Sequence, residues 1–272
     1  MDPRLQRRVQ RYGWDKAADV YEGFWANALR PAQERLLALA RIQPGEHVLD
    51  VACGTGLVAL PAAESVGAGG RVLATDISDA MVLNLRATAA ANGLAHLSVE
   101  RMDAESLDVA DATFDVVLCA LGLMYVPDPA RALAEMHRSL RPGGRTAVAV
   151  WGARSRCGWA EIFPIVEKRV ASEVCPLFFQ LGSGDALSYT LEQAGFRDIV
   201  TERIDAPIHY DTAEEACGAA FAGGPVALAY SHFDPPTRES AHAEYLESIE
   251  AYRSGSMYDV PGEFVVAIGA KL

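Results

Sequence analysis

Two acidic residues and the glycine-rich turn between them are the part of this sequence best suited to binding a ligand. Asp50 lies in a short apolar run, and the small residues that follow include Gly54 and Gly56. Glycines in such a turn let the backbone approach a ligand, and the helix that opens there points its free N–H groups toward it. A carboxylate in this corner would repel a pyrophosphate and attract an ammonium group. We therefore expect a ligand with an amino-acid-like end.

The second acidic residue, Asp76, stands at the carboxyl end of the next expected strand, residues 71–77. Nucleotide-binding sheets place an acid there, where it accepts hydrogen bonds from ribose hydroxyls. Asp76 is thus predicted to bind both hydroxyls of an adenosine. The alternative is that it only caps the helix expected over residues 80–91. We favour the ligand because Asp76 follows a strand at a suitable distance from the glycine turn.

A parallel sheet is needed to bring these residues together. Short apolar runs typical of buried strands alternate with stretches of helical spacing, and Asp128-Pro129 is a strong helix start. This alternation predicts an α/β, doubly wound sheet of seven strands, mostly parallel, with an antiparallel last strand at 264–272. The first six strands are expected at 48–51, 71–77, 97–101, 115–120, 146–151 and 199–204.

Five short segments resemble, in order, the motifs of class I S-adenosylmethionine-dependent methyltransferases. The group most similar to this chain is the ubiquinone/menaquinone C-methyltransferase-related (methyltransferase type 11) group. One glycine turn would be a weak signal, but five ordered segments are specific. The resemblance is good over residues 45–152 and implies a Rossmann-like fold. The segments are residues 50–56, 74–78, 102–105, 114–117 and 140–144.

This resemblance implies S-adenosylmethionine as cofactor, S-adenosylhomocysteine as its product, and a set of binding residues. By analogy, Met102 would pack on the adenine and Asp103 would accept a hydrogen bond from its exocyclic amine. Tyr21 would reach the methionine end from an N-terminal lid. The full set is Tyr21, Asp50, Ala52, Gly54, Gly56, Asp76, Ile77, Met81, Met102, Asp103, Ala104 and Ala120.

Three regions are expected along the chain. Residues 1–43 would form a helical lid whose many aromatic residues either pack on the domain or close over the ligands, with a second helix starting near Pro31. Residues 44–152 would form the cofactor-binding core. Residues 153–272 would complete the sheet and carry two insertions, 152–186 and 206–262, that shape the acceptor pocket. We call these insertions the cap and expect its second part to be helical.

Methyl transfer from a sulfonium needs alignment and a dry site, and acceptors differ mainly in how their proton is removed. The candidate bases are His209, His232 and Tyr230 in the cap and Tyr125 at the sheet edge, although a histidine without a motif is more often structural. Trp25, Tyr125 and Trp151 could hold a flat or a cationic acceptor. The sequence lacks an arsenite-type cysteine cluster and an Asn-Pro-Pro-Tyr-like motif, so we expect a small, largely apolar acceptor.

Composition narrows the partners further. The chain has 272 residues and a net charge of −12, which disfavours nucleic acid and anionic membranes as partners. No apolar run approaches the length of a membrane span, and no secretory signal is evident. The five cysteines show no metal-ligand spacing. We expect a cytoplasmic monomer or homodimer without a metal.

The leading hypothesis is a methyltransferase of a small metabolite, with a quinol C-methyltransferase as the best-known neighbour. The long 206–262 insertion departs from the shorter chains expected of that neighbour. A nicotinamide-dependent Rossmann oxidoreductase is an alternative, since residues 54–59 fit its fingerprint, but Asp50 and the later motifs argue against it. A non-catalytic adenosylmethionine-binding module is the third possibility.

Overall fold

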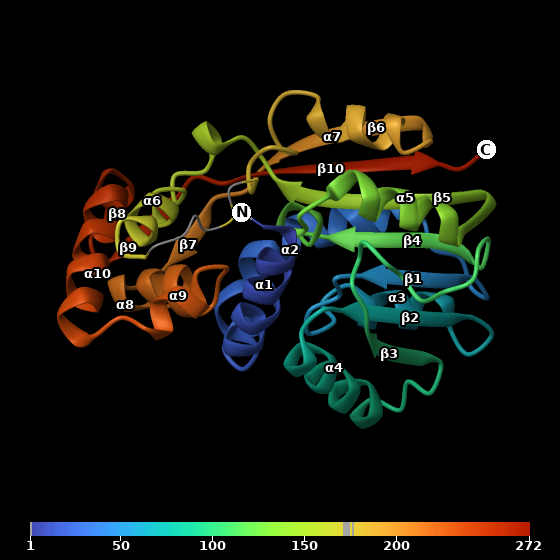
Figure 1. The fold of residues 1–272 in the computed structure, drawn as a ribbon, viewed down its shortest axis with the longest axis horizontal. Coiled ribbons are helices and arrows are strands. Elements are labelled where there is room, and N and C mark those ends of the chain that lie inside the picture. Colours follow the sequence, from blue (N-terminus) through green and yellow to red (C-terminus); the bar gives the residue numbers. More distant parts are fainter. Residues whose placement is uncertain (1, 171–174, 176) are drawn as a thin grey trace.

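The computed structural model describes residues 2–170, 175 and 177–272 (Figure 1). Its main feature is a seven-stranded sheet with the order β3-β2-β1-β4-β5-β10-β6. Six strands run in the same direction, and β10 runs antiparallel to its neighbours β5 and β6, which confirms the predicted sheet. The strands are β1 (His47–Val51), β2 (Arg71–Asp76), β3 (Leu97–Arg101), β4 (Phe114–Ala120), β5 (Leu140–Trp151), β6 (Arg197–Asp205) and β10 (Glu263–Ala270).

The strand order reverses at β1, because the chain adds β2 and β3 on one side and β4 and β5 on the other. Right-handed crossovers then place the connecting helices on opposite faces of the sheet. Figure 1 shows α3 behind the sheet and α5 in front of it. A crevice therefore opens at the ends of β1 and β4. The core helices are α3 (Ala59–Val66), α4 (Asp79–Ala91), α5 (Pro129–Ser139) and α7 (Ala186–Gln193).

The N-terminal segment differs from the expectation of a helix starting near Pro31. Helix α1 (Pro3–Ala17) is followed by one long helix, α2 (Tyr21–Ala40), which contains Pro31. The prediction was wrong because packing outweighs the missing N–H of proline: α2 buries Leu29 and Leu36 against β4, β5 and β10. By contrast, α1 lies between α4 and the cap helix α9 (Ala227–Ser231).

The second part of the cap also departs from expectation. It contains a three-stranded antiparallel sheet in the order β7-β9-β8, so the prediction of helices alone was wrong. Strand β7 alternates buried Ile208, exposed His209 and buried Tyr210, a period too short to recognise in sequence. The other cap elements are β8 (Arg253–Ser254), β9 (Met257–Val260), α6 (Ile162–Glu167), α8 (Ala213–Cys217) and α10 (Pro235–Ile249).

Several short helical turns complete the chain. They are η1 (Leu123–Tyr125), η2 (Arg154–Arg156), η3 (Gly218–Ala222) and η4 (Glu250–Tyr252).

The predicted start of α5 is confirmed, since the Asp128 carboxylate accepts from the backbone N–H of Arg131 at 3.0 Å. In the described ranges no helix combines the length and apolarity needed to cross a bilayer.

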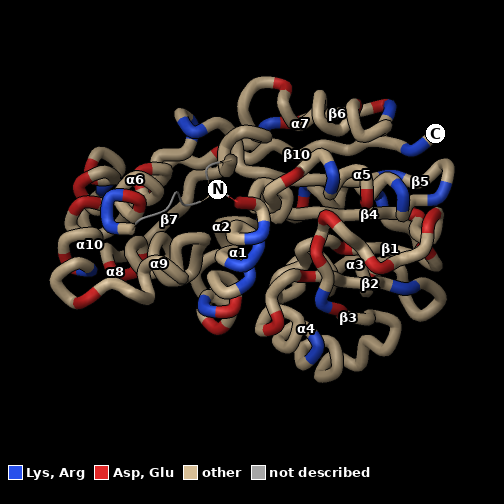
Figure 2. Tube along the Cα trace, viewed as in Figure 1, with Lys and Arg blue, Asp and Glu red and all other residues tan. Residues whose placement is uncertain are grey.

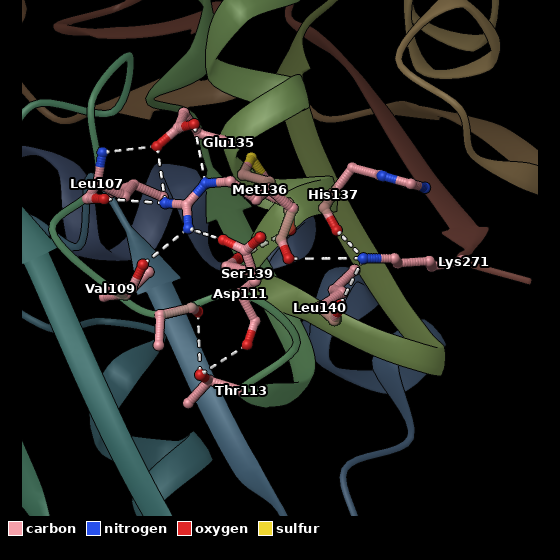
Figure 3. A network of polar contacts seen from close by, with 12 residues as sticks. Leu107, Val109, Asp111, Thr113, Glu135, Met136, His137, Ser139, Leu140 and Lys271 are labelled. Atoms are coloured by element: carbon pink, nitrogen blue, oxygen red, sulfur yellow. Dashed lines mark hydrogen bonds and ion pairs between the residues drawn. The ribbon is translucent and has the colours of Figure 1, made fainter.

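Two cations fasten the end of α5 to the sheet (Figure 3). Lys271, just after β10, donates to the carbonyls of His137 at 2.8 Å and Leu140 at 2.7 Å. Arg138 binds Glu135 and Asp111 as well as two carbonyls of the loop before β4. Positive charge at a helix C-terminus is favourable because the terminal carbonyls carry partial negative charge. The Lys271 contacts join the C-terminal segment to the junction of α5 and β5.

Candidate active site

A cavity lies at the carboxyl ends of the parallel strands and is lined by residues of the strand-end loops, of α1 and α2 and of the cap; its empty space, including the part open to solvent, is about 1170 Å³. This is the crevice where doubly wound sheets bind ligands. The cavity has two ends. The sheet end is formed by the motif-bearing loops with Tyr21, and the cap end by Trp25 and Leu29 of α2, the end of β5 and the cap. Eleven of the predicted site residues line the cavity: Tyr21, Ala52, Gly54, Asp76, Ile77, Met81, Met102, Asp103, Ala104, Ala120 and Tyr125.

The backbone is strained where β1 and β4 end. Ala52 and Leu121 both have positive φ, at 57° and 61°, which is costly for residues with a Cβ. A Cβ added at Gly122 would lie 2.3 Å from the Cβ of Ala52, so the two strand ends are in close contact. Gly56 is not one of the described residues that line the cavity. With φ at 100° and Leu85 packed where its Cβ would be, it shapes the turn.

Asp50 is buried beneath the turn, with 1% of its surface exposed. Neither of its carboxylate oxygens has a hydrogen-bond partner among the described residues. Burial, and secondarily the nearby Asp76, raise the pKa of Asp50 well above its usual range. The carboxylate lines a small pocket together with Tyr21 and Gln33. A buried acid without a partner is costly, and an ammonium group placed here would remove that cost.

Asp76 holds the turn against the end of β2. Its carboxylate accepts from the backbone N–H groups of Gly54 and Ser78, each at 2.9 Å. Burial raises the pKa of Asp76, while these N–H groups oppose the rise. Helix α4 is capped by Ser78 instead, whose hydroxyl accepts from the N–H of Met81 at 3.1 Å. The helix-cap alternative for Asp76 is therefore not what the structure shows.

Helix α1 contributes site residues that sequence reasoning missed. Arg7, Gln10 and Trp14 line the cavity, and Figure 2 shows basic residues along this helix. The Arg7 Nε lies 3.0 Å from the Asp103 carboxylate, and Arg7 also pairs with the buried Glu105. The basic residues of α1 were visible in the sequence, but their partners lie far along the chain.

Three further contacts fix α1 over the loop after β2. Arg11 pairs with Asp79. The Asp15 carboxylate accepts from the Ser78 hydroxyl at 2.6 Å and from the N–H of Ala80 at 3.1 Å. These contacts reach the same loop that carries Asp76, so α1 closes the sheet end of the cavity.

A continuous aromatic wall runs from the sheet end to the cap end of the cavity. Neighbouring rings meet at centroid distances of 4.8 to 6.2 Å, mostly edge to face. The predicted acceptor-holding residues Trp25, Tyr125 and Trp151 belong to it. Tyr21 was predicted as a cofactor-binding residue. Sequence patterns did not reveal Trp14, Phe178 and Trp159, because these residues come from separate segments of the fold. In spatial order the wall is Tyr21, Trp14, Tyr125, Phe178, Trp159, Trp151 and Trp25.

The two histidines proposed as bases lie outside this cavity. His209 has half of its side chain exposed and pairs with Asp259 at 2.8 Å and Asp211 at 3.2 Å; the bond to Asp259 is the main cause of its raised pKa. His232 is exposed. Both choices need correction, because a short strand and a helix end turn these side chains to solvent. Tyr125 does line the cavity, but burial raises its pKa well above the usual range.

A family profile described as a methyltransferase domain matches residues 48–144, the span that holds the turn, Asp76 and Asp103. The profile covers just over a third of the chain, and the sheet order agrees with it. The chain carries a class I S-adenosylmethionine-dependent methyltransferase domain. The prediction from the five motifs is confirmed.

Two relatives and one solved structure are similar to this methyltransferase. It is 29% identical to the nocamycin O-methyltransferase of Saccharothrix syringae, over 89% of this chain and 91% of the relative. It is 40% identical to a demethylmenaquinone methyltransferase of Alkalihalophilus pseudofirmus, over 39% of this chain and 44% of that one. A phosphoethanolamine N-methyltransferase of Haemonchus contortus, solved with S-adenosylhomocysteine, shares the fold. Its TM-score is 0.58 at 17% identity, covering 88% of this chain and 52% of the other.

Proposed function

We propose that this methyltransferase transfers a methyl group to a small, largely apolar acceptor held at the cap end of the cavity. The single observation that carries the proposal is the cavity itself, which is acidic at one end and aromatic at the other. The cap end is lined by residues outside the cofactor motifs, so it offers a place for a second molecule beside the cofactor.

The residues at the sheet end fit S-adenosylmethionine in chemistry. Asp50 offers an unpartnered carboxylate to the ammonium group, and Asp76 offers its remaining lone pairs to the ribose hydroxyls. Asp103 and Met102 would hold the adenine. Tyr21 packs 3.9 Å from where a Cβ on Gly54 would lie, so it covers the turn. The remaining contacts would be apolar walls, from Ala52, Ile77, Met81, Ala104 and Ala120, with Gly56 shaping the turn.

When bound, the cofactor supplies an electrophilic methyl group on a cationic sulfur. The protein then has to orient the acceptor and exclude water. The aromatic wall suits both tasks, because rigid rings define the position of a flat molecule and leave little space for solvent. The relative of nearly full length is named for O-methylation, which supports an oxygen acceptor over the quinol carbon. Five free, buried cysteines agree with a cytoplasmic location.

Calorimetric titration with S-adenosylhomocysteine tests the cofactor site directly. Asp76→Ala should weaken binding by about 2–4 kcal/mol, because two charge-assisted ribose bonds are lost. Asp259→Asn is the matched control, since Asp259 is exposed and pairs with His209 away from the cavity. If the folded wild type showed no affinity for S-adenosylhomocysteine, the proposal would be contradicted, and nicotinamide cofactors would be titrated next. Binding without any turnover of the methyl donor would favour the non-catalytic module.

A further inference from the structure

Four buried polar groups at the cap end of the cavity have no hydrogen-bond partner among the described residues. They are the indole N–H groups of Trp25 and Trp159 and the hydroxyls of Tyr210 and Tyr245. All four side chains are at most 7% exposed. The Tyr210 and Tyr245 hydroxyls lie close enough for a hydrogen bond between them to shift the pKa of each, although the geometry of that bond falls outside the ordinary range. Buried polar groups are normally paired, so this cluster needs an explanation.

All four unpaired groups are hydrogen-bond donors. An indole N–H has no acceptor capacity. Burial is the main cause of the raised pKa of Tyr210 and of Tyr245, so both keep their proton at neutral pH. What would satisfy them is a molecule with oxygen lone pairs, and a negatively charged oxygen would satisfy them best.

The same region offers nothing that could take a proton from the acceptor. In the part of the chain that the structure describes, the lining of the cap end includes no carboxylate, histidine or lysine. The other titratable residues of the lining lie toward the sheet end, and they are Arg7, Tyr21, Asp76, Asp103 and Tyr125. Tyr21 and Tyr125 are partly buried tyrosines, and desolvation is the main cause of the raised pKa of each. A neutral phenol with an ordinary pKa would therefore stay protonated here.

We infer that the acceptor enters the cap end as an oxygen anion, the ionised form of an acidic enol or phenol on a flat ring. It is held by the Tyr210 and Tyr245 hydroxyls and the indole N–H groups of Trp25 and Trp159. The inference rests on the proposed methyl transfer and names its substrate class. Such an acceptor needs no general base, because water has already taken its proton.

A cationic amine is the competing occupant, since aromatic walls also bind cations. It would leave all four donors unpaired, and no described carboxylate at the cap end would balance its charge. It would also lie beside a cationic sulfur. An anion would instead be attracted to the cationic sulfur, and this attraction is stronger in apolar surroundings than in water.

The transfer step is balanced without an additional reactant. The acceptor oxygen bonds to the methyl carbon as the carbon–sulfur bond breaks, and the electron pair of that bond remains on sulfur. One positive and one negative charge thereby cancel, which the dry aromatic wall favours. The tyrosine and indole donors hold the oxygen in place and are not consumed.

Ligand binding tests the inference independently of turnover. The probes are 4-hydroxycoumarin, which is an ionised enol near neutral pH, its uncharged 4-methoxy analogue, and 2-naphthylmethylammonium. Each is titrated by calorimetry into the enzyme saturated with sinefungin, a cationic analogue of S-adenosylmethionine. We expect 4-hydroxycoumarin to bind at least tenfold more tightly than either of the others, a difference of about 1.4 kcal/mol.

Substitutions then assign this preference to the tyrosine pair. Tyr210→Phe/Tyr245→Phe should bring the two coumarins to within about twofold of each other, with the affinity for S-adenosylhomocysteine unchanged as a check on folding. Tyr258→Phe is the control, because Tyr258 is buried opposite Tyr210 in the same small sheet but does not line the cavity.

Two results would overturn the inference while leaving the proposed function intact. One is S-adenosylhomocysteine binding together with equal affinity for the two coumarins, or tighter binding of the ammonium probe. The other is a preference for the anion that survives the double substitution. Loss of S-adenosylhomocysteine binding by the wild type would instead remove the proposed function itself.

Discussion

Asp50 combines two roles that oppose each other in the ligand-free protein. Its burial beneath the glycine turn disfavours its negative charge, and the neighbouring Asp76 adds repulsion. The same position places a carboxylate where the amino group of the cofactor is expected. Function at this residue is therefore obtained at the expense of stability, as is common at binding sites.

This conflict predicts a pH dependence for Asp50→Asn. The folded-state pKa of Asp50 lies above its unfolded value, so the folded state holds the proton more tightly and the free energy of unfolding falls as pH rises above about 4. The asparagine amide cannot ionise, so the free energy of unfolding of the variant should fall less steeply with rising pH. Near neutral pH the variant should therefore be more stable than wild type. Urea unfolding at several pH values measures the difference.

The same variant should bind S-adenosylhomocysteine at least tenfold more weakly, because the partner of the ammonium group is lost. Asp259→Asn again serves as the control. Parallel pH curves for wild type and Asp50→Asn would contradict the assignment of a raised pKa to this carboxylate.

At the scale of elements, α1 and α2 are held in place by different kinds of contact. Helix α2 is fixed by apolar side chains packed on the sheet. Helix α1 is tied to the sheet end of the cavity by charged and polar contacts, from Arg7, Arg11 and Asp15. We therefore propose that α2 is the structural part of the expected lid and that α1 is the part that moves. Contacts between partly exposed charges are weakened by salt.

Removing one of these contacts should loosen the site without unfolding the protein. Arg7→Ala should weaken S-adenosylhomocysteine binding about threefold to tenfold in low salt, since Asp103 and the buried Glu105 lose their cation. The difference from wild type should shrink in high salt. Arg8→Ala is the control, because Arg8 is exposed on the same helix. Equal effects of the two substitutions would argue against a closing role for Arg7.

At the scale of the whole molecule, the C-terminal strand joins parts that are distant in sequence. Strand β10 lies between β5 and β6, and Lys271 beyond it reaches the carbonyls at the end of α5. The cap also depends on this strand, since Glu263 at its start binds Arg203 at 2.8 Å and the N–H of Ala153 at 3.2 Å. The sheet and the acceptor pocket are therefore mechanically connected.

Lys271→Met should lower the free energy of unfolding by about 1–2 kcal/mol, because the carbonyls at the end of α5 lose a charged donor. Chemical denaturation measures the loss. Lys168→Met is the control and should stay within about 0.5 kcal/mol, since Lys168 belongs to an exposed pair with Glu244. Comparable losses in the two variants would mean that the C-terminal contacts add no particular stability.

The sequence by itself determined the sheet and the cofactor end of the site. Local signals sufficed there: buried strands read as apolar runs, Asp128-Pro129 starts α5, and each motif follows directly on its strand. Because parallel strands bring their carboxyl ends to one edge, residues such as Asp76 and Asp103 meet once the strand order is known. The family match over residues 48–144 agrees with this local character.

Only the tertiary structure decided the rest. Pro31 remains inside α2 because burial on the sheet outweighs a lost hydrogen bond, and His209 turns outward because β7 is too short to show its period. The donors of the cap end, Tyr210 and Tyr245 among them, come from segments with no shared pattern. Their nearness arises from packing between distant parts of the chain, which local propensity does not encode.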